Sequence, residues 1–240
     1  MLTIENEQDE EKNEDLIIAT CYNDDDIKIY DYKTKKIKKK IKCKFGFMFL
    51  DTYYDENSKK YYIICSNLID KEINDRKEEQ FTKIFDLETG DVYFEIKKYA
   101  HNVIIRKLHN YTEENKNTEN QIKNEVNNVS ILFASTNKIY IYDLYNKNLL
   151  KEIEVESVNY LHCICLWNKD YVIVGGDKKD NKIHIIDLNQ KKEIKTFDGY
   201  NIYTIAKFKD ENSENLYCQE LEKKGIHLFK AISINNNDDI

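Results

Sequence analysis

A short apolar run that ends in aspartate and leads directly into a turn occurs four times in this sequence. The aspartates are 55, 57 and 44 residues apart (86 − 31, 143 − 86 and 187 − 143). Self-similarity on this scale indicates an array of one small structural unit, and it constrains the fold more than any single residue does. The four runs are Ile27–Asp31, Phe81–Asp86, Lys138–Asp143 and Lys182–Asp187.

Most of the chain alternates apolar and polar residues, which is the pattern of a half-buried strand. Ile, Tyr, Phe, Val and Thr are also residue types that favour strands. The sequence therefore predicts an all-β protein built from four-stranded antiparallel units. The predicted strands are 16–22, 26–32 and 36–43, with Leu2–Ile4 as a candidate first strand; 45–55, 60–67, 81–87 and 92–98; 103–109, 129–136, 138–144 and 149–155; 159–167, 171–175, 182–187 and 193–197; and 202–209, 215–221 and 225–232, where no fourth strand is evident.

The chain has 240 residues, which is enough for one repeat domain or two small ones. We expect residues 1–240 to form a single repeat domain or a fragment of one. Three segments that are rich in charged and polar residues interrupt the strand pattern. Such segments bury too little apolar surface to hold a fixed structure, so we predict that they are mobile. They span residues 5–15, 67–80 and 111–128.

Composition narrows the classes of partner and compartment. The net charge of −7 disfavours nucleic acid or an anionic membrane as the main partner. No apolar stretch is long enough to span a bilayer, and no secretory signal is evident. The six cysteines form no Cys-x-x-Cys pair, which favours reduced, buried thiols. We therefore expect a cytoplasmic or nuclear protein without membrane insertion.

The ends of the four repeated runs resemble the dipeptide of WD repeats, with an aromatic or aliphatic residue before each aspartate. The matching pairs are Tyr30-Asp31, Phe85-Asp86, Tyr142-Asp143 and Ile186-Asp187. The resemblance implies a β-propeller of about five four-stranded blades around a central channel, either closed or as an incomplete ring. In that fold the bulky residue packs between blades, and the aspartate accepts hydrogen bonds from turn amides.

The sequence departs from the family pattern in its other positions. Of the family's Gly-His before a first strand, only the glycine remains in Gly199-Tyr200 and only the histidine in His101, and no dipeptide contains tryptophan. WD-repeat propellers commonly have about seven blades. The resemblance therefore favours a ring completed by self-association or by another chain segment, because an open arc would expose residues such as Ile29 and Phe208 at its ends.

No catalytic, metal or cofactor motif stands out. On a strand, His162 points away from the face shared by Cys163 and Cys165, so these three do not make a compact metal site. Asp24-Asp25-Asp26 lacks the remaining ligands of a calcium loop. The lysines from Lys33 to Lys44 fit an outer strand that is protected from edge-to-edge pairing. We expect no enzyme activity, no metal and no cofactor.

The resemblance implies a non-enzymatic scaffold that recruits other proteins through propeller loops. The expected surface is built by the loops that enter first strands and by those that join second to third strands. Large or charged residues there are the candidates, with packing between blades as the alternative role of each tyrosine. The candidates are Tyr99, His101, Tyr160, Lys178, Tyr200 and Tyr203.

Two other functions are weaker alternatives. A hydrolase with its site in the central channel would need acid–base groups at the channel mouth, where His101 and Asp198 are the candidates. A phosphoinositide-binding propeller would need paired arginines. Arg76 and Arg106 are the only two arginines, and they are far apart in the sequence.

Overall fold

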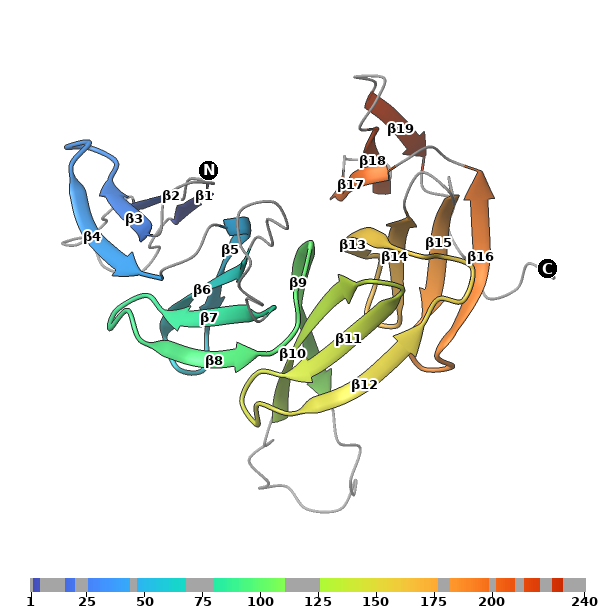
Figure 1. The fold of residues 1–240 in the computed structure, drawn as a ribbon, viewed down its shortest axis with the longest axis horizontal. Helices are drawn as coiled ribbons and strands as arrows, with labels where there is room; N and C mark the ends of the chain where they lie inside the picture. The colour runs from blue at the N-terminus through green and yellow to red at the C-terminus, as the bar shows by residue number, and fades with distance from the viewer. Residues whose placement is uncertain are drawn as a thin grey trace, which may run out of the picture. The chain divides into compact units, whose positions relative to one another are not determined.

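A computed structural model describes residues 2–4, 16–19, 26–43, 47–67, 80–110, 126–176, 182–198, 202–209, 214–220 and 226–230 (Figure 1). All regular secondary structure in these residues is β-strand, which confirms the predicted all-β class. The strands form five antiparallel sheets in chain order, four of them with four strands and the last with three. The chain divides into two compact units, Met1–Ala100 and His101–Ile240, and each is described by itself.

The first unit contains two four-stranded meanders, in which each strand pairs with the next along the chain. Sheet A has the order β1-β2-β3-β4 and sheet B has the order β5-β6-β7-β8. The strands of sheet A are β1 (Leu2–Ile4), β2 (Leu16–Ala19), β3 (Asp26–Asp31) and β4 (Ile37–Lys42). Those of sheet B are β5 (Phe47–Asp55), β6 (Lys60–Asn67), β7 (Thr82–Asp86) and β8 (Val92–Ile96).

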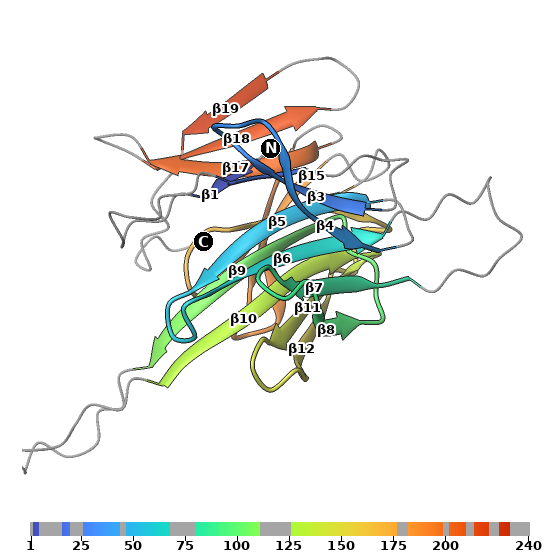
Figure 2. The same cartoon turned by 90° about the vertical axis from the view of Figure 1, so that its left-hand side faces the viewer.

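The second unit contains two further four-stranded meanders and a three-stranded sheet. Sheet C comprises β9 (Asn102–Asn110), β10 (Val126–Ser135), β11 (Lys138–Asp143) and β12 (Leu149–Glu154). Sheet D comprises β13 (Leu161–Leu166), β14 (Tyr171–Gly176), β15 (Lys182–Asp187) and β16 (Lys192–Asp198). Sheet E comprises β17 (Ile202–Lys209), β18 (Glu214–Glu220) and β19 (Ile226–Lys230), which lie side by side in Figure 2.

The predicted strands agree with the observed ones apart from their ends. Leu2–Ile4 is the first strand of sheet A, and sheet E has three strands in the described residues, as predicted. Residues 5–15, 68–79 and 111–125 lie outside the described residues, so most of the three segments predicted to be mobile is not placed. The predicted boundaries of two segments need correction. Asn67 belongs to β6, and residues 126–128 belong to β10, where they extend the ladder with β9.

Sheets A and B pack face to face in the first unit. Ile27, Ile29 and Ile41 lie in one buried cluster with Ile63 and Phe85 of sheet B. The expectation that Ile29 would be exposed at an open end is therefore wrong, because its side chain faces the neighbouring sheet and is buried. The side chain of Phe208, the other residue of that expectation, is outside the described part.

Sheets C, D and E pack successively in the second unit. The alternating strand residues supply both faces of sheet D: Ile164 and Val174 pack toward sheet C, while Cys163 and Ile173 pack toward sheet E. The first strands lie near one another, because β13 contacts both β9 and β17. At Gly175 a Cβ atom would approach the Cys163 Sγ to 2.8 Å and the Ile202 Cβ to 2.9 Å, so glycine permits the close approach of sheets D and E.

A β-bulge recurs at the same place in four sheets. The register between third and fourth strands shifts directly before the bulky residue of each repeated dipeptide. One residue of the fourth strand is therefore extra, and this accentuates the local twist of the sheet. The shifts lie between Ile29 and Tyr30, Ile84 and Phe85, Ile141 and Tyr142, and Ile185 and Ile186.

Candidate functional site

The aspartates of the repeat stabilise the turns that follow the third strands. The Oδ1 atoms of Asp86, Asp143 and Asp187 each accept hydrogen bonds from the backbone N–H groups two and three residues later, at 2.7–3.1 Å. Asp31 accepts one from Thr34 N at 2.6 Å. The carboxylate of aspartate is short enough to reach these amides, which is the geometry of an Asx turn. The expected bonding of the motif aspartates is thus confirmed.

Each of these turns ends with a residue whose backbone adopts the left-handed conformation. The fourth residue after each aspartate has positive φ, at Lys35, Gly90, Lys147 and Lys191. In three of the turns its N–H also donates to the carbonyl oxygen of the aspartate. A fifth turn of this kind follows Asp55 between β5 and β6, with Ser58 bonded to the carboxylate and positive φ at Lys59. Sequence reasoning did not find this turn, because Asp55 follows a first strand and not a third.

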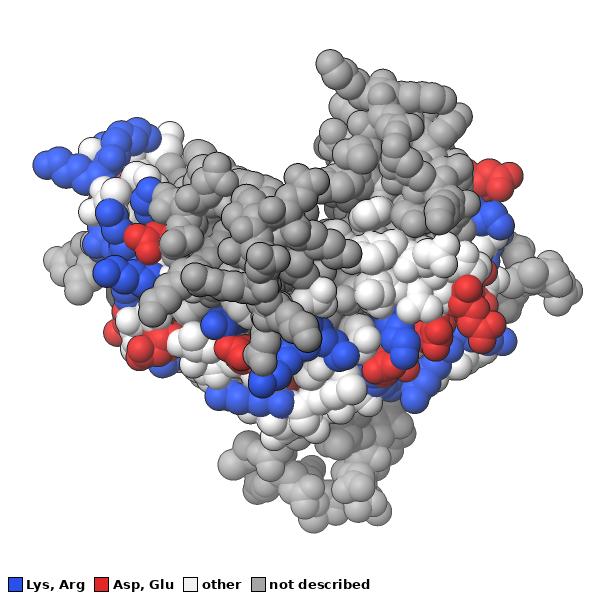
Figure 3. Space-filling model, in the orientation of Figure 1, with Lys and Arg blue, Asp and Glu red and all other residues white. Residues whose placement is uncertain are grey.

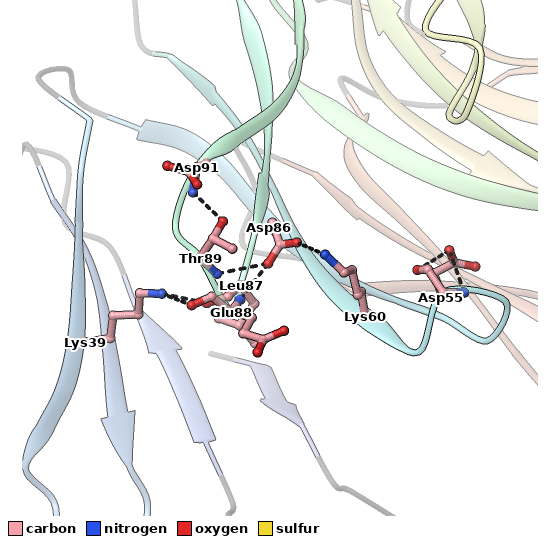
Figure 4. Close-up of polar contacts among 9 residues, drawn as sticks. Lys39, Asp55, Lys60, Asp86, Leu87, Glu88, Thr89 and Asp91 are labelled. Carbon is pink, nitrogen blue, oxygen red and sulfur yellow. Dashed lines mark hydrogen bonds and ion pairs between the residues drawn. The ribbon is translucent and has the colours of Figure 1, made fainter.

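An ion pair adds to the stability of the turn after β7 (Figure 4). Lys60 Nζ lies 2.7 Å from Asp86 Oδ2. Burial acts to raise the pKa of Asp86, but the hydrogen bonds from Lys60 and from the amides of Thr89 and Glu88 outweigh it and hold the pKa below its usual value. The amide of Thr34 is the main cause of the lowered pKa of Asp31. Both aspartates are therefore ionised at neutral pH, as acceptors of amide hydrogen bonds should be.

Lysines on fourth strands connect neighbouring sheets. Lys39 Nζ on β4 donates to the carbonyl oxygen of Leu87, in the turn of sheet B, at 3.1 Å and also to that of Glu88 (Figure 4). Lys151 Nζ on β12 donates to the Leu188 carbonyl oxygen in the turn of sheet D at 3.0 Å. The two lysines are equivalent, since they pair with Ile29 and Ile141 directly before the bulges. Leu87 and Leu188 are equivalent too, each following the aspartate of its repeat.

An aromatic cluster lies where the chain enters β9 and β13. The His101 ring centroid is 5.3 Å from that of Tyr160 and 5.0 Å from that of His162, both in edge-to-face geometry. The Tyr160 and His162 centroids are 5.8 Å apart. All three side chains are half-buried. The structure thus brings together two predicted interaction residues, His101 and Tyr160, and adds His162. We call these three residues the entry cluster.

The environment of the entry cluster keeps His101 neutral. The pKa of His101 is lowered to about 4, mainly by burial and secondarily by the nearby His162. A neutral imidazole can both donate and accept a hydrogen bond, and its ring can pack on another aromatic ring. The cluster therefore offers apolar contact area with polar edges.

Hydrogen bonds hold the chain in place at the start of β13 and in the segment that precedes β9. In the second unit, Leu161 N at the start of β13 donates to the Thr136 carbonyl oxygen, in the turn between β10 and β11, at 2.7 Å. In the first unit, Ala100 N donates to Ser66 Oγ on β6 at 2.9 Å, and Thr82 Oγ1 on β7 donates to the Lys98 carbonyl oxygen at 2.9 Å. Rigid positioning of a loop residue favours its use in binding, because less conformational entropy is lost.

The other predicted interaction residues are not brought into this cluster. Tyr99 is buried, as in its alternative role as a packing residue. Lys178 and Tyr200 lie outside the described residues, and Tyr203 lies in β17 with a side chain that is not described. His162 was missed as a partner of Tyr160, although residues two apart on a strand share one face. In the sequence, its neighbours Cys163 and Cys165 make His162 a candidate metal ligand and not a partner of an aromatic ring.

The cysteines whose side chains are described are buried free thiols, as predicted from their spacing. These four are Cys43, Cys65, Cys163 and Cys165. Cys218 lies in β18, and its side chain is not described. Burial raises the pKa of Cys43 to about 11 and that of Cys65 well above its usual value. Cys163 and Cys165 pack toward sheet E, whereas His162 belongs to the entry cluster. Among the described residues, no group of His, Cys, Asp or Glu has the arrangement of a metal site.

The residues named for the two weaker alternatives lie apart. Arg106 is buried on β9 and donates from Nη1 to the Lys169 carbonyl oxygen at 3.1 Å, so it links sheet C to a turn of sheet D. Asp198 is exposed at the end of β16. Arg76 lies outside the described residues.

Sheet D carries one polar group that sequence reasoning missed. The side chain of His184 on β15 is fully buried, and its Nδ1 lies 2.7 Å from Glu193 Oε2. Ser157 Oγ donates to the same carboxylate oxygen at 3.1 Å. Glu193 occupies the position opposite the bulky residue of the dipeptide, where the other four-stranded sheets have the exposed apolar residues Ile37, Val92 and Leu149. The contact gives this sheet a polar link that the others lack at that position.

Comparison with known proteins leaves the family of this chain open. The sequence matches no protein-family model. No curated protein matches it at a significant level. The part of the chain that is described has no helix of the length and apolar character that a membrane span requires.

Proposed function

We propose that this chain is a β-propeller of the WD-repeat type, with about five blades, that recruits other proteins without catalysing a reaction. Repetition of one four-stranded meander with the same aspartate turn supports the repeat class. Face-to-face packing of successive sheets within each unit, with β9, β13 and β17 near one another, is the local arrangement of neighbouring blades.

The entry cluster carries the functional part of the proposal. Tyr160, His101 and His162 are large, half-buried and held by short segments at the beginning of two neighbouring strands. Aromatic side chains of this kind contribute disproportionately to protein interfaces, because they bury much area with little loss of conformational freedom. We infer that a partner protein contacts the end of sheets C and D where β9 and β13 begin.

Differential affinity capture tests the proposal. The full chain and its Tyr160→Ala and His101→Ala variants are immobilised, and retained proteins are quantified. We expect a partner that the unmodified chain retains and that both variants lose by roughly tenfold or more, which corresponds to about 1.4 kcal/mol. Titration calorimetry with the purified partner should then give the same ratio between the affinity of the unmodified chain and that of each variant.

A matched variant controls for loss of an aromatic residue elsewhere. Tyr145 lies in the turn after β11, at the opposite end of sheet C, and is also half-buried. Tyr145→Ala should retain the partner. Equal loss in all three variants, or retention by all of them, would contradict the assignment of the entry cluster. Turnover of a substrate by the purified chain would contradict the scaffold function itself.

A further inference from the structure

The turn and the fourth strand of the β3–β4 hairpin carry a high density of positive charge. Residues 33–44 contain eight lysines and no acidic residue, although the whole chain has a net charge of −7. Lys36, Lys38, Lys40 and Lys42 are exposed. In Figure 3 the blue atoms of basic side chains gather over this hairpin with little red among them. We call the surface formed by these four lysines and Lys28 the basic hairpin.

Strand register places like charges directly opposite each other on this surface. Lys40 of β4 pairs with Lys28 of β3. Cross-strand partners point to the same face of a sheet, and like charges in that position are destabilising. Lys42 shares this face with Lys40, because residues two apart on a strand do so. Ile41, between them, faces sheet B instead. The cross-strand partner of Lys42 is Asp26, so three lysines share this face with one carboxylate. A negatively charged ligand would be attracted to the excess positive charge.

The outer edge of β4 is also distinctive. Among the described strands, β4 pairs with β3 alone, so it ends sheet A. The fourth strands of sheets C and D mix charges, with Lys151 beside Glu152 in β12 and Lys192 beside Glu193 in β16. An outer strand needs few charges to prevent edge-to-edge pairing. Protection of the edge accounts for lysine on β4, but not for the absence of acidic residues from residues 33–44, where β12 and β16 have glutamate beside lysine.

We propose that the basic hairpin binds an acidic, extended segment of a partner protein that lies along β4. Carboxylates at alternate positions of an extended chain match lysines at alternate positions of a strand. This surface lies on sheet A, whereas the entry cluster lies on sheets C and D of the other unit. The inference therefore goes beyond the proposed function and does not depend on it.

A protein segment fits this surface better than a single-stranded nucleic acid does. Nonspecific single-strand binding combines phosphate contacts with stacking of bases on exposed aromatic rings. The exposed ring of the hairpin is Tyr32, and Lys35 Nζ already lies 3.5 Å from its centroid. The surface therefore supplies positive charge on an extended strand without an open stacking platform.

Fluorescence anisotropy with the full chain tests the proposal. The probe is a labelled peptide of about twelve residues that alternates Glu and Thr, at about 50 mM salt to limit screening. Lys36, Lys40 and Lys42 are changed together to Glu. We expect this triple variant to weaken binding of the peptide by at least roughly tenfold. A Lys→Gln triple variant, which introduces no new negative charge, should show a smaller loss.

A charge-matched control separates the site from the effect of net charge. The control variant changes Lys169, Lys192 and Lys195, all exposed on sheet D, to Glu. It alters the net charge by the same amount and should retain nearly full affinity. Circular dichroism establishes that both variants are folded. Equal losses in the two triple variants, no binding of the peptide, or tighter binding of an oligothymidylate of equal length would each overturn the proposal.

Discussion

At the scale of single residues, aspartate is used here as a turn anchor with a defined set of partners. Asp143 and Asp187 are both buried, and each accepts two backbone amides. Those amides have no strand partner within the turn, so the carboxylate is their acceptor. Its removal would leave donors in a poorly hydrated position, and this is more costly than the loss of a solvent-exposed hydrogen bond.

Replacement of these aspartates should destabilise the fold. We expect Asp143→Ala and Asp187→Ala each to lower the free energy of unfolding by about 1–3 kcal/mol, measured by chemical denaturation. Asp143→Asn should cost less, because the amide oxygen can still accept. Asp198→Ala is the control, since Asp198 is exposed at a strand end. Indistinguishable midpoints for Asp143→Ala, Asp187→Ala and Asp198→Ala would contradict the structural role of the motif.

His101 should make the stability depend on pH. The pKa of His101 is about 4 in the folded chain, because burial and His162 lower it, whereas a histidine in an unfolded chain has a pKa of about 6.5. Between these values the unfolded chain binds more protons than the folded chain. The free energy of unfolding contributed by His101 should therefore fall as the pH is lowered from about 6.5 toward about 4.

The His101→Gln variant isolates this contribution. Urea denaturation at about pH 7.5 and about pH 5.5 should show a smaller loss of stability on acidification for the variant than for the unmodified chain. The pKa values of Asp31 and Asp86 are lowered, so these two turn aspartates stay ionised throughout this pH range. Equal losses would mean that His101 is hydrated in the folded chain and not held neutral by its surroundings.

At the scale of elements, the fourth strand does more than close each meander. Its bulge aligns a lysine with the turn of the next sheet in two cases, Lys39 with Leu87 and Lys151 with Leu188. Both contacts are partly buried, and each joins a cationic donor to main-chain oxygen. Such bonds are stronger than hydrogen bonds between two neutral groups. Because the acceptor is a main-chain oxygen, they depend little on which side chain the acceptor residue carries.

Removal of the lysine head group should loosen the packing of neighbouring sheets. We expect Lys39→Met and Lys151→Met each to lower the free energy of unfolding by about 1 kcal/mol, because the carbonyl oxygens lose a charged donor while the apolar stem of the side chain is retained. Lys40→Met is the matched control, since Lys40 is exposed beside Lys39. Denaturation midpoints that change equally for Lys39→Met and Lys40→Met would refute the inter-sheet role.

At the scale of the whole molecule, the last sheet is the least complete. In the described residues, β19 pairs with β18 alone, and sheet E has no fourth strand. A strand with an open edge presents N–H and C=O groups that can pair with another chain. The fourth strands of sheets A to D also have an open edge, but their lysines, other charges or bulges discourage pairing.

We therefore expect the isolated chain to self-associate or to bind a further segment that completes sheet E. Light scattering during gel filtration should give a mass that rises with protein concentration above 28.7 kDa. A Leu228→Lys substitution on β19 should lower that mass, because charge on an edge strand opposes pairing. A constant mass of 28.7 kDa at every concentration, with a cooperative thermal transition, would show that the chain needs no completion.

The sequence by itself determined the strands, the order of the meanders and the aspartate turns. These features depend on local chemistry: side-chain alternation with a period of two, and hydrogen bonds that span two to four residues. The same locality explains why the Asp143 turn could be anticipated in detail. Strand ends were less certain, as at Val126, because a ladder continues for as long as its partner strand does.

Only the tertiary structure decided which distant residues meet. Lys39 lies 48 residues from Leu87 in the sequence, and His101 lies far from Tyr160 and His162, so no local pattern signals either contact. The burial of Ile29 was likewise misjudged, because it depends on which face of sheet A meets sheet B. Such contacts follow from the packing of completed sheets, and the sequence encodes that packing through shape and volume, which have no period that can be read along the chain.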